Sequence, residues 1–147
     1  MTLSRKALCV VYALIGMTAL VTTWANVLGA VQQYGFWEGT VRFWQDTLVN
    51  ESSRFITIDL LFLGLTVILW MLREARRLAI PGVWVYVIGG LLIAISLTVP
   101  LFMIQRERTL ARLDAGAPAG QLGTGDLAGF ITLVAVSLGY AAVALSR

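Results

Sequence analysis

Asp59 is the residue whose type and position in this sequence most suggest chemistry. It stands about one turn inside an apolar run from Phe55 to Leu72, and ionisable groups within such runs are costly enough to be candidates for function. A carboxyl group there can donate a proton to a lipophilic substrate, bind a cation or hydrogen-bond another helix. It can also be structural, because a helix N-terminus stabilises a carboxylate and Arg54 is close enough in sequence to pair with it. Asp59 is the only candidate catalytic residue, and both interpretations stay open.

A second candidate site surrounds Pro100, which lies inside the apolar run at 81–105. Proline has no amide hydrogen, so it frees the carbonyl group four residues back, which belongs to Ser96. A kink that exposes this carbonyl can line a cavity, and the hydroxyl groups of Ser96 and Thr98 would add polar contacts. Prolines in membrane helices are also common as kinks that packing absorbs. The candidate ligand-binding residues are therefore Asp59, Ser96, Thr98 and Pro100.

Two charged clusters follow apolar runs, at 73–77 and at 106–108. Glu74 and Arg77 stand at i and i+3, a spacing that favours a local ion pair. Such clusters usually determine topology or anchor helix ends, but they can also contact anionic headgroups or a partner protein. The candidate residues for these contacts are Arg73, Glu74, Arg76, Arg77, Arg106 and Glu107.

The sequence contains no histidine, and Cys9 is its only cysteine. These two facts exclude His-ligated haem, His-based zinc sites and His-dependent triads. They also exclude an internal disulfide or a CxxC redox pair. We expect no cofactor and no metal site. The sequence disfavours an enzyme without excluding one.

The composition indicates a membrane protein. Of the 147 residues, 59% are hydrophobic and 13% are charged, which is about half the charged share of an ordinary soluble domain. A soluble domain of this size cannot bury so much apolar surface. The formal net charge is +3, but the basic residues lie beside apolar runs and form no basic face with interleaved aromatic residues. We therefore expect no nucleic-acid partner.

Four apolar runs are long enough to cross a bilayer as helices, because about 20 helical residues span the hydrocarbon core. They cover about 7–31, 55–72, 81–105 and 127–145. Backbone groups in lipid must be paired within their own segment, which favours helices over strands. A cleaved signal peptide is the alternative for the first run, although this run is too long for a typical signal. The predicted fold is an all-α, single-domain bundle of four transmembrane helices.

The connections between the runs differ in character. Trp37, Val41, Trp44 and Leu48 share one helix face, which predicts a short amphipathic helix at about 36–49 that lies in the membrane interface. An ordinary surface helix packed on the ends of the bundle is the alternative. The segment at about 114–126 is rich in glycine and alanine and is predicted to be a flexible loop.

Four spans would place both termini on one side of the membrane. Six basic residues would then lie on that side and five on the other, which is a weak bias. The dense clusters beside the first two spans favour cytoplasmic termini. The residues on the terminal side would be Arg5, Lys6, Arg73, Arg76, Arg77 and Arg147, and those on the opposite side Arg42, Arg54, Arg106, Arg108 and Arg112.

Several short motifs between Arg54 and Arg108 recur in a familiar order. They are Arg54 with Asp59, the EARRL of Glu74 to Leu78, Trp84, Ser96, the VPLF of Val99 to Phe102, and Arg106-Glu107. This pattern resembles a family of small bacterial membrane proteins catalogued as domain of unknown function 2834. The resemblance implies a four-span protein of the bacterial inner membrane without an assigned reaction. The segment before the fourth run does not match the family pattern.

Three functions remain open on the sequence. Small size, short loops and small-residue helix faces favour a non-catalytic accessory subunit of a larger membrane complex. A lipid- or isoprenoid-binding protein, or an intramembrane enzyme, would use Asp59 as proton donor or polar anchor. A small solute or ion carrier is the third possibility. The expected partners are membrane lipids, together with a larger membrane complex or a second copy of the chain.

Overall fold

The structure is a computed structural model that describes residues 2–113 and isolated positions between 124 and 142. The predicted loop at 114–126 and the predicted fourth span at 127–145 lie outside the described residues, apart from those isolated positions. Within 2–113 the chain is helical except for short connections. Three stretches are long and apolar enough to cross a membrane: Leu3–Tyr34, Glu51–Arg77 and Val83–Leu113.

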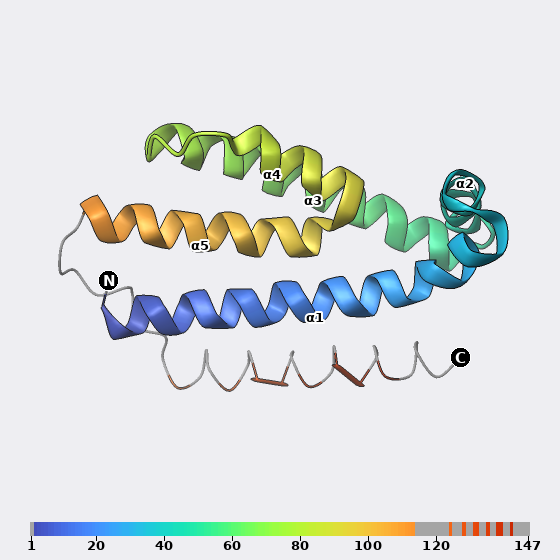
Figure 1. Ribbon diagram of the computed structural model, residues 1–147, viewed down its shortest axis with the longest axis horizontal. Coiled ribbons are helices and arrows are strands. Elements are labelled where there is room, and N and C mark those ends of the chain that lie inside the picture. The colour runs from blue at the N-terminus through green and yellow to red at the C-terminus, as the bar shows by residue number, and fades with distance from the viewer. Residues whose placement is uncertain are drawn as a thin grey trace.

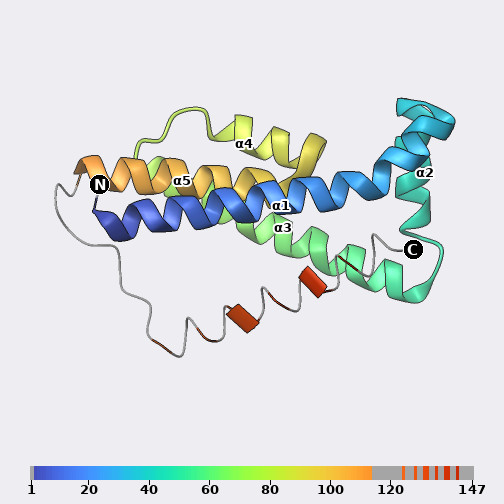
Figure 2. The ribbon, with the colours of Figure 1, turned by 60° about the horizontal axis from the view of Figure 1, so that its bottom comes forward.

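The first helix, α1 (Leu3–Tyr34), contains the first predicted span and extends it at both ends. It ends at Gly35, whose φ of 80° is a conformation that glycine adopts without strain. The chain then turns into α2 (Phe36–Asp46), which crosses the end of α1 (Figure 2). A Cβ atom at Gly39 would lie 3.0 Å from the backbone of Ala30. The close crossing of the two helices therefore depends on glycine at this position.

The third helix, α3 (Glu51–Arg77), begins at Asn50, whose side chain accepts a hydrogen bond of 2.8 Å from the Ser53 amide. This N-cap satisfies one of the backbone donors that a helix start leaves unpaired. The helix is longer at both ends than the predicted span at 55–72. It runs from the α2 end of the molecule back to the end where α1 begins (Figure 1).

The third predicted span, 81–105, is present as an apolar stretch but is not one straight helix. It consists of α4 (Val83–Gly89), a π-helical segment η1 (Gly90–Ala94) and α5 (Ile95–Leu113). The rings of Tyr86 and Phe102 lie 5.7 Å apart, whereas sixteen residues of straight helix would separate them by about 24 Å. The stretch therefore folds back on itself, and α4 and α5 form a helical hairpin (Figures 1 and 2).

The bend of this hairpin lies at η1, ahead of Pro100, which the sequence analysis had taken as the site of the kink. Glycine permits the bend, because Cβ atoms at Gly89 and Gly90 would lie 3.3 Å and 2.8 Å from the Thr98 side chain. With no side chain at either position, α5 can turn back close to the end of α4. Pro100 lies in the interior of α5 and is buried.

The hydrophobic core lies where the end of α3 meets the hairpin. Phe102 is fully buried there, and its ring makes edge-to-face contacts with Trp70 and Tyr86. Such aromatic pairs contribute about 0.5–1.5 kcal/mol beyond the area that they bury. The cluster is completed by Met71, Ala75, Leu78 and Ile80.

The first helix packs antiparallel to α5 along most of their shared length. Cβ at Gly16 would lie 3.4 Å from the side chains of both Leu97 and Pro100. Further along, the Trp24 indole donates a hydrogen bond of 3.2 Å to the Ile93 carbonyl group in η1. Both ends of the hairpin therefore lie at the end of the molecule where α1 begins and α3 ends.

Candidate functional site

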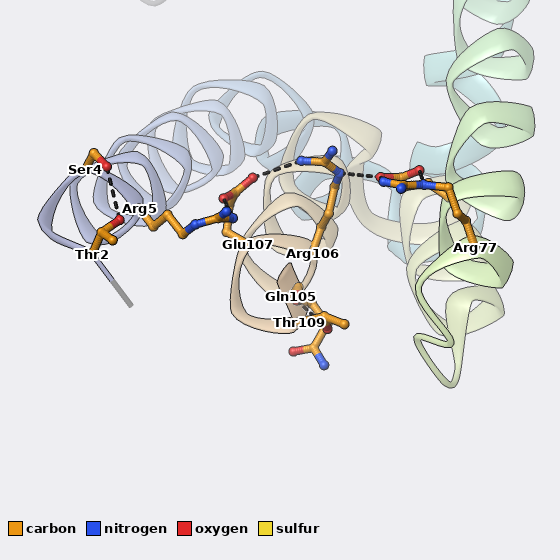
Figure 3. A network of polar contacts seen from close by, with 9 residues as sticks. Thr2, Ser4, Arg5, Arg77, Gln105, Arg106, Glu107 and Thr109 are labelled. Atoms are coloured by element: carbon orange, nitrogen blue, oxygen red, sulfur yellow. Dashed lines mark hydrogen bonds and ion pairs between the residues drawn. The ribbon is translucent and has the colours of Figure 1, made fainter. Parts of the chain in front are cut away.

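A network of charged side chains joins three helices at the end of the molecule where α1 begins (Figure 3). The first turn of α1 supplies Arg5, the last turn of α3 supplies Glu74 and Arg77, and α5 supplies Arg106 and Glu107. We call these five residues the ion-pair network. Its members lie as far apart as 102 positions in the sequence, so the network forms only when the helices pack.

Glu107 is the inner carboxylate of the network. Its Oε2 atom accepts a hydrogen bond of 3.0 Å from Arg5 Nη1, and its Oε1 atom accepts one of 2.9 Å from Arg106 Nη1. The Arg5 and Glu107 side chains are each only 6% exposed. Two guanidinium groups therefore neutralise a carboxylate that would be costly to bury alone.

Glu74 is the outer carboxylate and binds two arginines. Arg77 donates two bonds of 2.7 Å, from Nε to Oε2 and from Nη2 to Oε1, and Arg106 Nε donates a third bond of 2.7 Å to Oε1. The predicted pair of Glu74 and Arg77 is thus confirmed. Glu74 lies beyond Leu72, the last apolar residue of the span, and its hydrogen bonds with Arg77 and Arg106 lower its pKa to about 2.

The network is suited to holding helices together rather than to chemistry. Arg106 bridges Glu74 and Glu107, and in this way α5 is tied to both α1 and α3. Charge-assisted and bidentate bonds of this kind are the strongest that side chains form. Because guanidinium groups occupy both carboxylates, neither is available as a general base or as a cation ligand.

Sequence reasoning placed Arg106 and Glu107 among the residues for headgroup or partner contacts, and it treated Arg5 only as a topology signal. In the structure, all three residues form ion pairs that join helices. The residues around an arginine at the start of an apolar run do not indicate which distant carboxylate it will bind. No local signal in the sequence therefore identifies the contact between Arg5 and Glu107. Arg73 and Arg76, by contrast, are exposed on α3.

Asp59 lies on an exposed part of α3. Arg54 donates to the Leu48 carbonyl group at 2.9 Å instead of pairing with it. Within the described residues, no hydrogen bond or ion pair involves Asp59. Gly64, five residues further along α3, faces the Ile95 side chain of the hairpin, so Asp59 lies about 7.5 Å along the helix axis from this contact.

The other predicted ligand-binding residues are packing residues of the hairpin. Thr98 is buried against Gly90 and donates a long hydrogen bond of 3.4 Å to the Ala94 carbonyl group. Pro100 is buried against Gly16, and Ser96 is half-buried. A shallow, open depression of about 490 Å³ lies beside the first turns of α3, and its described lining includes none of the predicted site residues. This lining consists of Glu51, Ser52, Phe55 and Ile56.

The comparisons with known proteins identify a family. No curated protein and no solved structure matches the chain significantly. A family profile described as "Protein of unknown function DUF2834" matches residues 11–108, which include both carboxylates of the ion-pair network and the whole α4–η1 turn. This match covers about two thirds of the chain, and the chain therefore belongs to that family.

Proposed function

We propose that this protein is a non-catalytic accessory subunit of a larger membrane complex, and that it binds its partner through the N-terminal part of α3. The observation that carries the proposal is Asp59, an ionisable residue on a part of a membrane-type helix that the rest of the described chain leaves bare.

The surface of α3 is largely bare over its first four turns. The large hydrophobic residues between Phe55 and Leu65 are 52–74% exposed, and they include four consecutive positions from Leu60 to Leu63. Consecutive helix positions point in different directions, separated by about 100°. Only a narrow face of this segment, which carries Ser53, Thr57 and Gly64, is partly covered by the described residues, and either lipid or another helix must surround the rest.

Lipid alone is a poor environment for Asp59. The residue lies four positions beyond Phe55, which places it about 6 Å below the first apolar residue of the span. An aspartate at the centre of a membrane helix costs about 2.5–3.5 kcal/mol on insertion scales, and this cost is the reason that such residues pair with one another or with backbone groups. A hydrogen-bond donor on a partner helix would remove this energetic cost. The need for such a donor supports α3 as the contact surface.

The other two functions lack comparable support. A lipophilic-ligand protein or intramembrane enzyme would gather Asp59 with Ser96 and Thr98 around one cavity, but Thr98 is packed against Gly90 and Asp59 lies beyond the α3–hairpin contact. A carrier would need polar groups along a path, and both carboxylates of the ion-pair network are bound to arginines. No specific observation favours either function over the accessory role.

The hairpin also supports an orientation in the bacterial inner membrane. It brings the basic residues of α5 to the end of the molecule where α1 begins, so that, among the described residues, eight basic residues lie at this end and only Arg42 and Arg54 at the other. By the positive-inside rule the N-terminus is cytoplasmic. A fourth span at 127–145 would then take the C-terminus to the opposite side, contrary to the expectation from four straight spans. The eight residues are Arg5, Lys6, Arg73, Arg76, Arg77, Arg106, Arg108 and Arg112.

The test is a pull-down of the tagged full-length protein from its native membrane in a gentle detergent, with mass spectrometry of proteins and lipids. We expect one larger membrane protein at near-equal abundance, and we expect an Asp59→Leu variant to lose it. Leu65→Ala should weaken the same interaction. The matched control is Leu14→Ala on α1, since Leu14 and Leu65 are almost equally exposed, at 63% and 61%.

Two results would contradict the proposal. One is a stable protein that copurifies with no partner. The other is a partner that is retained equally by the wild type and by Asp59→Leu. A defined lipid or terpenoid in place of a protein partner would favour the lipophilic-ligand function instead.

A further inference from the structure

Five basic side chains lie on the same helix ends as the ion-pair network, within a few positions of its members in the sequence. Each is exposed, and within the described residues none of them forms an ion pair. They come from the same three helices as the network. We call them the cationic rim: Lys6 on α1, Arg73 and Arg76 on α3, and Arg108 and Arg112 on α5.

Among the described residues, the carboxylates near the rim cannot neutralise it. Glu74 and Glu107 are both buried, and both are occupied by arginines of the network. The opposite end of the molecule differs, because Arg42 is paired with Glu38 at 2.9 Å and Arg54 is bonded to a backbone carbonyl group. Among the described residues, the excess positive charge is therefore concentrated at one end of the molecule, on exposed side chains.

The position of the rim next to exposed apolar side chains indicates which group neutralises its positive charge. One helical turn inward from Lys6 and from Arg73 lie the exposed apolar side chains of Val10 and Leu69, which are suited to lipid tails. The long arms of lysine and arginine can then extend to the headgroup layer. Arginine binds phosphate with paired hydrogen bonds.

We propose that the cationic rim is a binding surface for the phosphate groups of anionic phospholipids in the leaflet that it faces. The chemistry recognised is a phosphate ester held by several guanidinium groups from different helices. This proposal does not depend on the accessory role, because it concerns the opposite end of α3 from Asp59 and needs no protein partner.

The experiment is native mass spectrometry of the full-length protein in a neutral detergent with an equimolar mixture of phosphatidylglycerol and phosphatidylcholine of the same acyl chains. We expect phosphatidylglycerol adducts to predominate. Each basic residue near a membrane surface contributes about fivefold in affinity for anionic lipid. An Arg73→Gln/Arg76→Gln double variant and an Arg108→Gln/Arg112→Gln double variant should therefore each weaken the preference by about 25-fold.

The matched control is Arg42→Gln/Arg54→Gln, which removes the same charge from the opposite end and should keep the preference. A variant with lysine at all four rim arginines should retain most of the preference for phosphatidylglycerol. It serves as a control that the substitutions do not unfold the protein. Equal binding of the two lipids would overturn the proposal, as would a preference that survives replacement of all four arginines by glutamine. Displacement of lipid by millimolar inorganic phosphate, but not by chloride of equal ionic strength, would show a free-phosphate site and would also overturn it.

Discussion

The two ends of the molecule are held by contacts of different range. At the end where α1 begins, Arg5 and Glu107 pair across 102 positions of sequence. At the other end, Arg42 pairs with Glu38 one turn away, and Asn50 caps its own helix through Ser53. The first end can exist only in the folded chain, whereas the second is assembled from neighbouring residues.

The difference in range suggests a division of roles. The end with the ion-pair network brings three helices together around buried charges and the aromatic core of Phe102. The other end leaves α2 and the start of α3 with exposed apolar surfaces, including Trp37 at 80% and Phe55 at 74% exposed. This end therefore carries the apolar surface that the proposed partner helix would need.

The largest expected effect concerns the topology of the hairpin. In a Cys9→Ala background, single cysteines at Ala79 and Leu113 should react with a membrane-impermeant maleimide from the same side. A cysteine at Val49 should react only from the other side. All three positions are exposed. Because α4 and α5 fold back on each other, we expect positions 79 and 113 to flank a stretch that enters and leaves the membrane on the same side. Labelling of these two positions from opposite sides would contradict the hairpin.

The next effect concerns the buried carboxylate at the network end. Glu107→Gln removes the carboxylate that accepts from both Arg5 and Arg106, in a site where the Arg5 and Glu107 side chains are each 6% exposed, and breaking such a buried ion pair costs about 3–5 kcal/mol. Glu38→Gln breaks an exposed pair of the same kind at the other end and should cost about 0.3–0.5 kcal/mol. Thermal unfolding in detergent measures both changes, and equal losses would show that the two ends do not differ.

A smaller effect should distinguish two glycines. Gly90→Ala would place a Cβ atom 2.8 Å from Thr98 Oγ1, and overpacking of this kind costs about 1–3 kcal/mol. Gly29→Ala meets no atom within 4 Å, so the better helix propensity of alanine should make it neutral or slightly stabilising. Thr98→Ala should partly rescue Gly90→Ala. Unfolding midpoints test all three, and an unaffected Gly90→Ala would contradict the close packing of the bend.

The candidate site could be predicted only in part, because its members differ in the range of their contacts. Glu74 and Arg77 were predicted to pair, since an i, i+3 spacing brings side chains together in any helix. Arg106 and Glu107 were singled out as charged residues but not as partners of α1 and α3. Their pairing with Arg5 and Glu74 depends on how α5 is placed, and no spacing in the sequence encodes that placement.

Composition and hydrophobic pattern were enough to predict that the chain is helical and apolar, and approximately where its helices lie. Hydrophobic composition and the need to pair backbone groups in lipid act on each segment alone, so α1, α2 and α3 contain or overlap their predicted ranges. Whether the third stretch runs straight or turns back at η1 depends on tertiary packing, and in the structure it turns back. An apolar run has the same composition in either case, and the choice depends on contacts between distant residues such as Tyr86 with Phe102 and Arg5 with Glu107.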